Sequence, residues 1–289
     1  MTNTKIALIT TIENKNNKNN VFGNFKVQRD YEKEAIECFK HWRKNGGWLK
    51  DIPIYTHCPT KNTISDETIK ELKKLNVTYD ETYIKSTEEH INGFINVYAT
   101  GKHFENLDLD IDIFIHIDLD MKLIKELPST LFMNLKNDNQ NIIKCGVYTK
   151  SSLFNQRNSG TDLVFDTGFI ISRKDSNFYN YFYDKILEFI KNPDENYLKI
   201  KESRKNLPIT DYDIEEYFLD KLVYEEKLNV TALKNYQLGE GYPSIKEFSD
   251  DELKEVYFWH EHLYYDKSEY DAVKEKIQYK KRMNKLKDI

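Results

Sequence analysis

The chain has 289 residues, 39% of them hydrophobic and 13% aromatic, which supplies a core for one large domain or two small ones. Its 43 basic and 48 acidic residues give a net charge of −5, which argues against nonspecific nucleic-acid binding because that binding needs positive charge. No apolar run approaches the ~18 residues of a membrane-spanning helix, and the polar first residues do not resemble a signal peptide. We therefore expect a soluble cytoplasmic protein, with Cys38, Cys58 and Cys145 as free buried thiols because their spacing fits no metal site.

The first half of the chain alternates between apolar, β-favouring runs and segments with apolar residues at helical spacing. Ser65 or Asp66 caps the second helix, and Gly46-Gly47 ends the first. Such alternation predicts right-handed crossovers and a mostly parallel sheet flanked by helices, with ligands bound beyond the carboxyl ends of the strands. Strands are predicted over 5–11, 52–56, 77–84 and 113–117, and helices over 30–44, 65–75 and 88–104.

The second half is less regular. Strands are predicted over 142–148, 163–172 and 230–233, helices over 176–191 and 213–225, a charged connection over 193–205 and an extended segment over 255–265. No repeat or Gly/Ser-rich linker interrupts the chain, so we predict a single domain over 1–267, with halves 1–120 and 121–267. Residues 268–289 are predicted to form a basic helical tail, either solvated or resting on an anionic membrane surface.

Two carboxylates follow the fourth predicted strand. Asp118 and Asp120 come directly after the apolar run 113–117, and the period of two in a strand predicts that both point to the same side. Like charges at the end of a buried strand repel each other unless a cation lies between them. Mg²⁺ and Mn²⁺ take oxygen ligands and commonly hold phosphates as well. The pair therefore predicts a metal-diphosphate site, although Asp108 and Asp110 show that the spacing alone is common.

The segment 113–127 resembles the metal-binding motif of GT-A-fold glycosyltransferases. The resemblance implies a Rossmann-like, mostly parallel sheet in the nucleotide-binding half 1–120 and a mixed-sheet acceptor and donor-sugar half over 121–267. It implies Mn²⁺ or Mg²⁺ as the cofactor, a nucleotide-sugar donor, expected to be a UDP-sugar, and a hydroxyl acceptor on a glycan, protein or lipid. Asp120 would be the principal metal ligand, and Asp118 would bind the metal or the ribose.

A second segment, 165–172, is similar to the strand that lines the sugar and acceptor pocket in that family. Asp166 stands where the family commonly has Asn, and Gly168 lacks the Cβ that would keep a sugar away from the backbone. The alternative is an ordinary strand with a glycine bulge.

A third segment, 208–215, resembles the acidic helix start that faces the donor sugar in the family. Helix capping alone also explains an aspartate at this place. Asp166, Asp211 and Asp213 are the candidates for the catalytic base that an inverting enzyme needs, whereas a retaining enzyme needs no dedicated base.

A late pair of histidines resembles the third metal ligand of glycosyltransferase family 8, whose motif order this chain follows. His260, or His262 as its alternate, would bind the metal through a neutral imidazole. The family's glycine is absent and Lys267 is out of register, so packing within an aromatic segment is the alternative.

The nucleotide pocket is expected at the end of the first strand and on the helix before the acidic pair, where polar residues are spaced near whole turns. Its candidate residues are Thr10, Thr11, Asn92, Asn96 and Lys102. A merely solvated helix face is the alternative for the last three. His116, inside the strand, is expected to be a hydrogen-bonded core histidine.

Three other functions fit parts of the pattern. Haloacid dehalogenase-like phosphatases also have an Asp-x-Asp, but on their first strand, and Lys122 stands where they have Thr or Val. A metal-dependent nucleotidyltransferase would need a glycine-rich phosphate loop, which Gly23 alone does not make. A catalytically inactive sugar-binding or scaffold module is the non-enzymatic alternative.

Overall fold

The structure is a computed structural model that describes residues 4–13, 21–22, 25–26, 30–85, 95–132, 135, 143–149, 163–203, 214–225, 228–233, 237–239 and 256–260. The predicted tail 268–289 lies outside these residues. Within them, no helix combines the length and apolar character needed to cross a membrane.

The predicted parallel sheet is present. Strands β1 (Ile6–Thr11), β4 (Ile54–His57), β5 (Val77–Asp80) and β6 (Ile113–Ile117) run parallel, in the order β6-β1-β4-β5. All residues of β6 and nearly all of β1 are buried, as expected for strands covered on both faces. Strand β5 ends earlier than predicted, at Asp80, so this carboxylate lies at the carboxyl edge of the sheet.

The sheet continues into a mixed half. Strand β9 (Leu163–Arg173) runs antiparallel to both β6 and β8 (Ile143–Thr149), and β10 (Val230–Leu233) is parallel to β8. Together they form one sheet of seven strands in the order β10-β8-β9-β6-β1-β4-β5. The predicted α/β class, with a mostly parallel half and a mixed half flanked by helices, is confirmed.

Helices α1 (Tyr31–Asn45) and α2 (Asp66–Lys74) cover one face of the sheet. Each begins as predicted, because Asp30 accepts a hydrogen bond from Lys33 N and Ser65 from Thr68 N. Phe39 and Trp42 are fully buried against the strands. Burial of a side chain such as Phe39 stabilises the fold by about 1.5–3 kcal/mol, so this face anchors α1 firmly.

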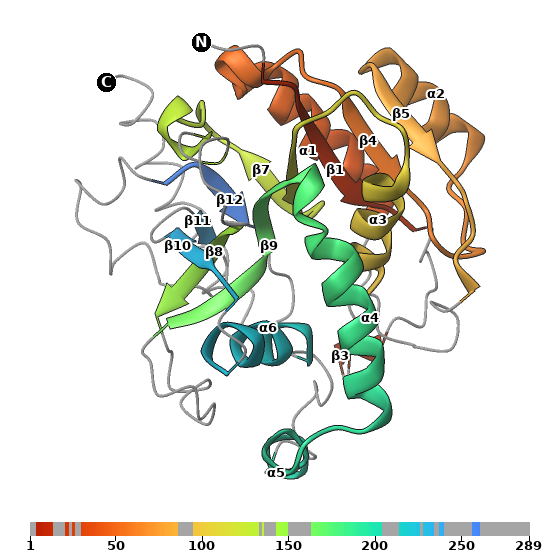
Figure 1. The fold of residues 1–289 in the computed structure, drawn as a ribbon. Coiled ribbons are helices and arrows are strands. Elements are labelled where there is room, and N and C mark those ends of the chain that lie inside the picture. Colours follow the sequence, from red (N-terminus) through yellow and green to blue (C-terminus); the bar gives the residue numbers. More distant parts are fainter. Residues whose placement is uncertain are drawn as a thin grey trace, which may run out of the picture.

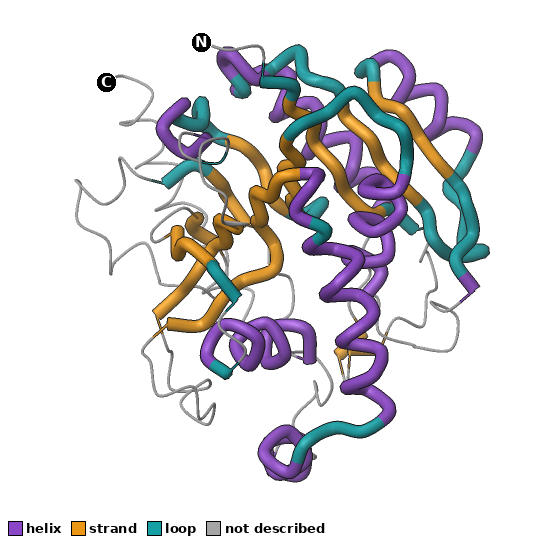
Figure 2. The backbone as a smooth tube through the Cα atoms, in the orientation of Figure 1, coloured by secondary structure: helices purple, strands orange, loops and turns teal. Residues whose placement is uncertain are grey.

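Helices α3 (Ile95–Asn106), α4 (Phe178–Lys191) and α6 (Ile214–Tyr224) cover the other face. Figure 2 shows the strands in orange with helices in purple on both sides. Tyr98 of α3 and Phe182 of α4 stack with ring centroids 3.9 Å apart. Gly101 permits this approach, since a Cβ there would lie 2.1 Å from the Tyr179 ring.

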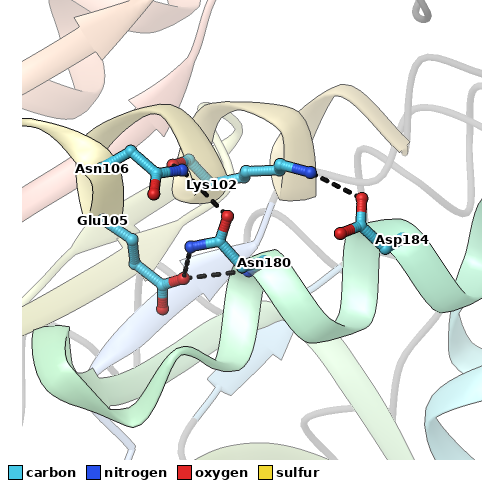
Figure 3. A network of polar contacts seen from close by, with 5 residues as sticks. All are labelled: Lys102, Glu105, Asn106, Asn180 and Asp184. Carbon is cyan, nitrogen blue, oxygen red and sulfur yellow. Dashed lines mark hydrogen bonds and ion pairs between the residues drawn. The ribbon is translucent and has the colours of Figure 1, made fainter.

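Polar contacts also join α3 to α4 (Figure 3). Asn177, which precedes α4, has a left-handed φ of 56° and makes no side-chain cap. Glu105 of α3 replaces that cap, because its carboxylate accepts hydrogen bonds from Tyr179 N at 3.1 Å and Asn180 N at 2.9 Å. Burial raises the pKa of Glu105 despite these bonds. The first turn of α4 is thus completed by another helix.

A small second sheet lies beside the first (Figure 1). It contains β11 (Gln237–Gly239), β12 (Phe258–His260) and β7 (Met121–Leu123), in that order. Strand β12 is antiparallel to β7 and parallel to β11, and Phe258 packs into the core on the α1 side. The late segment therefore returns to the residues that follow the acidic pair.

Several elements were not predicted. Residues 193–205, expected to be a charged connection, contain helix α5 (Glu195–Ser203), so that prediction is wrong. Its sequence is rich in Lys and Glu and offers too few apolar residues to show a helical stripe. The remaining short elements are strands β2 (Val21–Phe22) and β3 (Phe25–Lys26) and the 3₁₀ segments Gly47–Leu49, Ser129–Phe132 and Lys174–Ser176.

Candidate functional site

The two aspartates lie in a turn at the carboxyl edge of the sheet. Strand β6 ends at Ile117, Asp118 N continues the ladder to Gly168 O at 3.0 Å, and Met121 N donates to Asp118 O at 3.1 Å. The chain therefore turns between the two aspartates, and that both carboxylates point to the same side stays a prediction. The turn, not the pleat, sets the directions of Asp118 and Asp120.

Asp118 lies against the Asp166–Gly168 segment, as the sequence predicted. A Cβ on Gly168 would lie 3.1 Å from both Asp118 Oδ2 and Asp166 Oδ1. Asp166 is buried, and its Oδ1 accepts a hydrogen bond from Gly168 N at 2.7 Å. The absence of a side chain at Gly168 therefore leaves room for two carboxylates to face each other.

A register shift in β9 creates this arrangement. Cys145 of β8 pairs with Ile170, but the next residue, Gly146, pairs with Asp166. The three residues 167–169 are skipped by β8, whereas Phe169 still pairs with Ile117 of β6. The glycine bulge considered as an alternative to a functional reading is thus present, and it is what brings Gly168 to Asp118.

The two aspartates differ in exposure. The side chain of Asp118 is 33% exposed, whereas Asp120 is only 5% exposed. Burial raises the pKa of the Cys38 thiol on α1, and the charges of Asp120 and Asp118 raise it further. Cys38 is a free buried thiol, as predicted, and so is Cys58. At neutral pH the Cys38 thiol is therefore uncharged and adds no negative charge to the site.

His116 is not the hydrogen-bonded core histidine that was predicted. It is 1% exposed, and neither ring nitrogen has a hydrogen-bond partner in the described part of the structure. Asp118 Oδ1 lies 3.5 Å from His116 Nε2, which is close enough for an ion pair if the ring is protonated.

The late histidine segment returns to the acidic turn. Strand pairing places His260 opposite Met121, the residue that follows Asp120. The side chain of His260 lies outside the described part of the structure, and so do residues Asn92, Asp211, Asp213 and His262. Their predicted roles remain predictions.

The expected nucleotide residues of β1 and α3 meet at the end of β1. Thr10 Oγ1 donates to Ile117 O at 2.9 Å, which joins the ends of β1 and β6. Thr11 Oγ1 lies 2.8 Å from Thr100 Oγ1 and 3.2 Å from Asn96 O. Asn96 Nδ2 donates to the buried carboxylate of Glu13, which sequence reasoning missed.

Lys102 lies elsewhere. Its amine pairs with Asp184 of α4 (Figure 3). The same amine lies 5.2 Å from the centre of the Tyr183 ring. Asn96 and Thr100 contact β1, so α3 presents Lys102 and the pocket residues to different neighbours. The structure brings Thr11 and Asn96 together, directs Thr10 to the end of β6 and places Lys102 in the contact between α3 and α4.

A second group of polar side chains lies at the ends of β4 and β5. One ligating atom each from His57, Asp80 and His103 lies within 4.8 Å of the other two. Among the described residues this is the one such set of three, so Asp118, Asp120 and Asp166 do not form another. Sequence reasoning missed it because its members are far apart in the chain, although His57 directly follows a predicted strand.

Comparisons with known proteins give a distant likeness. No family model and no curated protein matches the chain. Among solved structures, the chain is similar to the glycosyltransferase GlyE of Streptococcus pneumoniae TIGR4, with a TM-score of 0.46 and 12% sequence identity. The match covers 80% of this chain and 45% of that one, so this chain spans less than half of that protein's length.

Proposed function

We propose that the chain is a metal-dependent glycosyltransferase that moves a sugar from a nucleotide-sugar donor, expected to be a UDP-sugar, to a hydroxyl acceptor on a glycan, protein or lipid. The observation that carries the proposal is the turn containing Asp118 and Asp120 at the carboxyl edge of the sheet, with Gly168 and Asp166 against it. This edge is where α/β sheets bind their ligands.

The residues of the turn suit Mn²⁺ or Mg²⁺. Asp118 offers a partly exposed carboxylate, and Gly168 has no side chain to fill the space beside it. Hard cations prefer carboxylate oxygens as ligands. In this proposal Asp118 and Asp120 hold the ion, with His260 as an additional ligand whose backbone already lies beside the turn. The ion would supply positive charge to the diphosphate leaving group.

Protein groups around the turn take the remaining roles. Thr10, Thr11, Asn96 and Glu13 form a mostly buried polar group at the end of β1, adjacent to β6, and we assign them to the nucleoside. Asp118 is the alternative ribose ligand. Gly168 lets the sugar approach the backbone of β9.

The catalytic base remains a choice among Asp166, Asp211 and Asp213. Asp166 Oδ1 is held by Gly168 N, which favours a positioning role for Asp166 over proton abstraction. A retaining, family 8-like reaction needs no dedicated base, since the donor phosphate accepts the proton of the acceptor hydroxyl.

The test measures binding of a panel of nucleotide sugars by thermal shift and calorimetry, with and without Mn²⁺, for the wild type and Asp120→Asn. We expect metal-dependent binding in the wild type and at least about tenfold weaker binding in the variant, equal to about 1.4 kcal/mol. Asp108→Asn is the matched control, because Asp108 belongs to another Asp-x-Asp, is exposed and lies away from the turn.

Two outcomes reject the proposal. If no nucleotide sugar stabilises the protein in a metal-dependent way, the chain has no donor site of the proposed kind. Hydrolysis of simple phosphate esters that depends on Asp118 identifies a dehalogenase-like phosphatase instead. Sugar-nucleotide hydrolysis without an acceptor, lost in Asp120→Asn, separates a transferase from an inactive sugar-binding module.

A further inference from the structure

The group formed by His57, Asp80 and His103 lies apart from the acidic turn. His57 is the last residue of β4, Asp80 is the last residue of β5, and His103 is on α3. In the sheet, β1 separates β4 from β6, so the two carboxyl ends are two strands apart, roughly 10 Å at about 4.8 Å per strand. We propose that these three residues bind a divalent transition metal of the Zn²⁺ class, which ties α3 to the edge of the sheet.

The spacing of the ligating atoms fits one ion. Ligands about 2.0–2.2 Å from a tetrahedral Zn²⁺ are roughly 3.3–3.5 Å apart. In the structure, His103 Nε2 and Asp80 Oδ2 are 2.9 Å apart, and the group as a whole spans no more than 4.8 Å. Binding therefore requires each distance between two ligating atoms to change by about 1.5 Å or less. The two rings, which stack at an interplanar angle of 17°, must also turn so that both ring planes contain the ion.

Neighbouring groups already orient the ligands. His57 Nδ1 lies 3.0 Å from Thr100 Oγ1, and His57 Nε2 lies 2.8 Å from Thr82 O. Whichever nitrogen binds the ion, the other keeps a hydrogen-bond partner, which is the usual arrangement for a metal-binding histidine. Asp80 Oδ1 is likewise held by Thr82 N at 2.8 Å and leaves Oδ2 on the side of His103.

The two imidazoles lie face to face beside the carboxylate. The His57 and His103 rings stack with centroids 4.4 Å apart, a distance at which two protonated imidazoles would repel each other.

The ligand types decide the class of metal. Two imidazoles and one carboxylate suit Zn²⁺ and its first-row neighbours, whereas Mg²⁺ and Ca²⁺ prefer oxygen ligands throughout. The side chain of Asp80 is 28% exposed and that of His103 is 12% exposed, so water can complete the coordination from the solvent side. Metal binding by this group does not depend on the proposed transferase activity.

The experiment uses tag-free full-length protein purified without chelator. Metal content is measured by mass spectrometry, and Zn²⁺ and Co²⁺ binding is measured by calorimetry and by the visible absorption of tetrahedral Co²⁺. We expect one equivalent of bound metal and a higher melting temperature with Zn²⁺. His103→Gln keeps a side-chain N–H for Asp80 but lacks the imidazole, so affinity should fall by at least about tenfold.

Three further variants assign the bound metal to this group of residues. Asp80→Asn keeps an acceptor for Thr82 N and serves if His103→Gln does not fold; it should also lose the metal. His41→Gln removes a histidine of α1 outside the group and should bind like the wild type. Asp120→Asn should keep the Zn²⁺ equivalent, which distinguishes this site from the acidic turn. Wild type without bound or titratable metal, or His103→Gln with unchanged affinity, overturns the inference.

Discussion

At the scale of single residues, Gly168 has the most direct influence on the candidate site. It lies where β9 leaves its pairing with β8 and continues with β6, and its missing side chain is the space that Asp118 and Asp166 face. A contact of 3.1 Å from a new Cβ to two carboxylate oxygens is closer than ordinary van der Waals contact. Even the smallest substitution here must move one of the acids.

We therefore expect Gly168→Ala to weaken metal-dependent nucleotide binding by roughly tenfold, about 1.4 kcal/mol. The fold should lose less than about 1.5 kcal/mol, since the new methyl group meets the ends of two side chains and not the backbone. Calorimetric titration checks the loss of binding, and urea unfolding of the same sample checks the loss of stability. A variant that binds normally would show that Asp118 does not need its present position.

Single residues also show where sequence reasoning ended. Asp118 and the Asp166–Gly168 segment were predicted to belong to one site because both resemble parts of the site of one family. Glu13 was missed since its loop sequence is typical of a solvated segment, and the partner that buries it, Asn96, is distant in the chain. His103 was missed, because no local pattern links it to Asp80.

At the scale of secondary structure elements, Asp194 joins two helices of the second half. Its Oδ1 caps α5 by accepting from Tyr197 N at 2.8 Å, and it also accepts from Tyr217 OH of α6 at 2.9 Å. Lys221 Nζ lies 3.2 Å from the other carboxylate oxygen. One acid therefore starts α5 and holds it to α6.

This arrangement gives a pH dependence of known sign. Burial raises the pKa of Asp194, but hydrogen bonds from Tyr197, Tyr217 and Lys221 outweigh it and lower the pKa. A lowered pKa means stability that is present above the unfolded-state value, near 3.9, and lost as pH falls through the folded value. Asp194→Ala should lower the free energy of unfolding by about 1–2 kcal/mol at pH 7 and by progressively less toward pH 3.

Asp194→Asn is the matched variant, because its amide oxygen still caps α5 without the charge. Its free energy of unfolding should fall less than that of Asp194→Ala at pH 7. In urea unfolding it should show the same weaker dependence of this free energy on pH in the acid range. A cost for Asp194→Ala that is constant from pH 7 to pH 3 would contradict the assignment.

Elements were predicted best where both faces of a strand or one face of a helix are apolar, as in β1, β6 and α4. Strand β7 has three residues and acquires its identity from pairing with β12, more than a hundred residues later. Helix α5 lacks an apolar stripe and is fixed by Asp194 and by Tyr197 packing on Phe189. Such elements depend on distant partners, which local periodicity does not reveal.

At the scale of the whole molecule, β9 makes the two halves of the chain one hydrogen-bonded unit. It pairs with β6 of the first half and with β8 of the second, so neither half has a complete sheet without it. The two hydrophobic clusters lie on opposite faces of that shared sheet. The single domain over 1–267 stays a prediction, which the unfolding behaviour can test.

We expect one cooperative unfolding transition. Replacing Trp48 and Trp259 with Phe leaves Trp42, which is fully buried against the first half, as the fluorescent reporter. Its urea midpoint should coincide with that of far-ultraviolet circular dichroism, which reports on all helices and strands. Two separated transitions would instead show two domains.

The completion of α4 by Glu105 of α3 has a mechanical consequence. Since backbone N–H groups in the first turn of α4 find their acceptor on α3, and Gly101 lets the Tyr179 ring rest on that helix, the two helices are joined as one packed pair. Another face of α3 carries Asn96 and Thr100, which touch the end of β1. A change in the position of α3 at the end of β1 is therefore shared by α4 through these contacts.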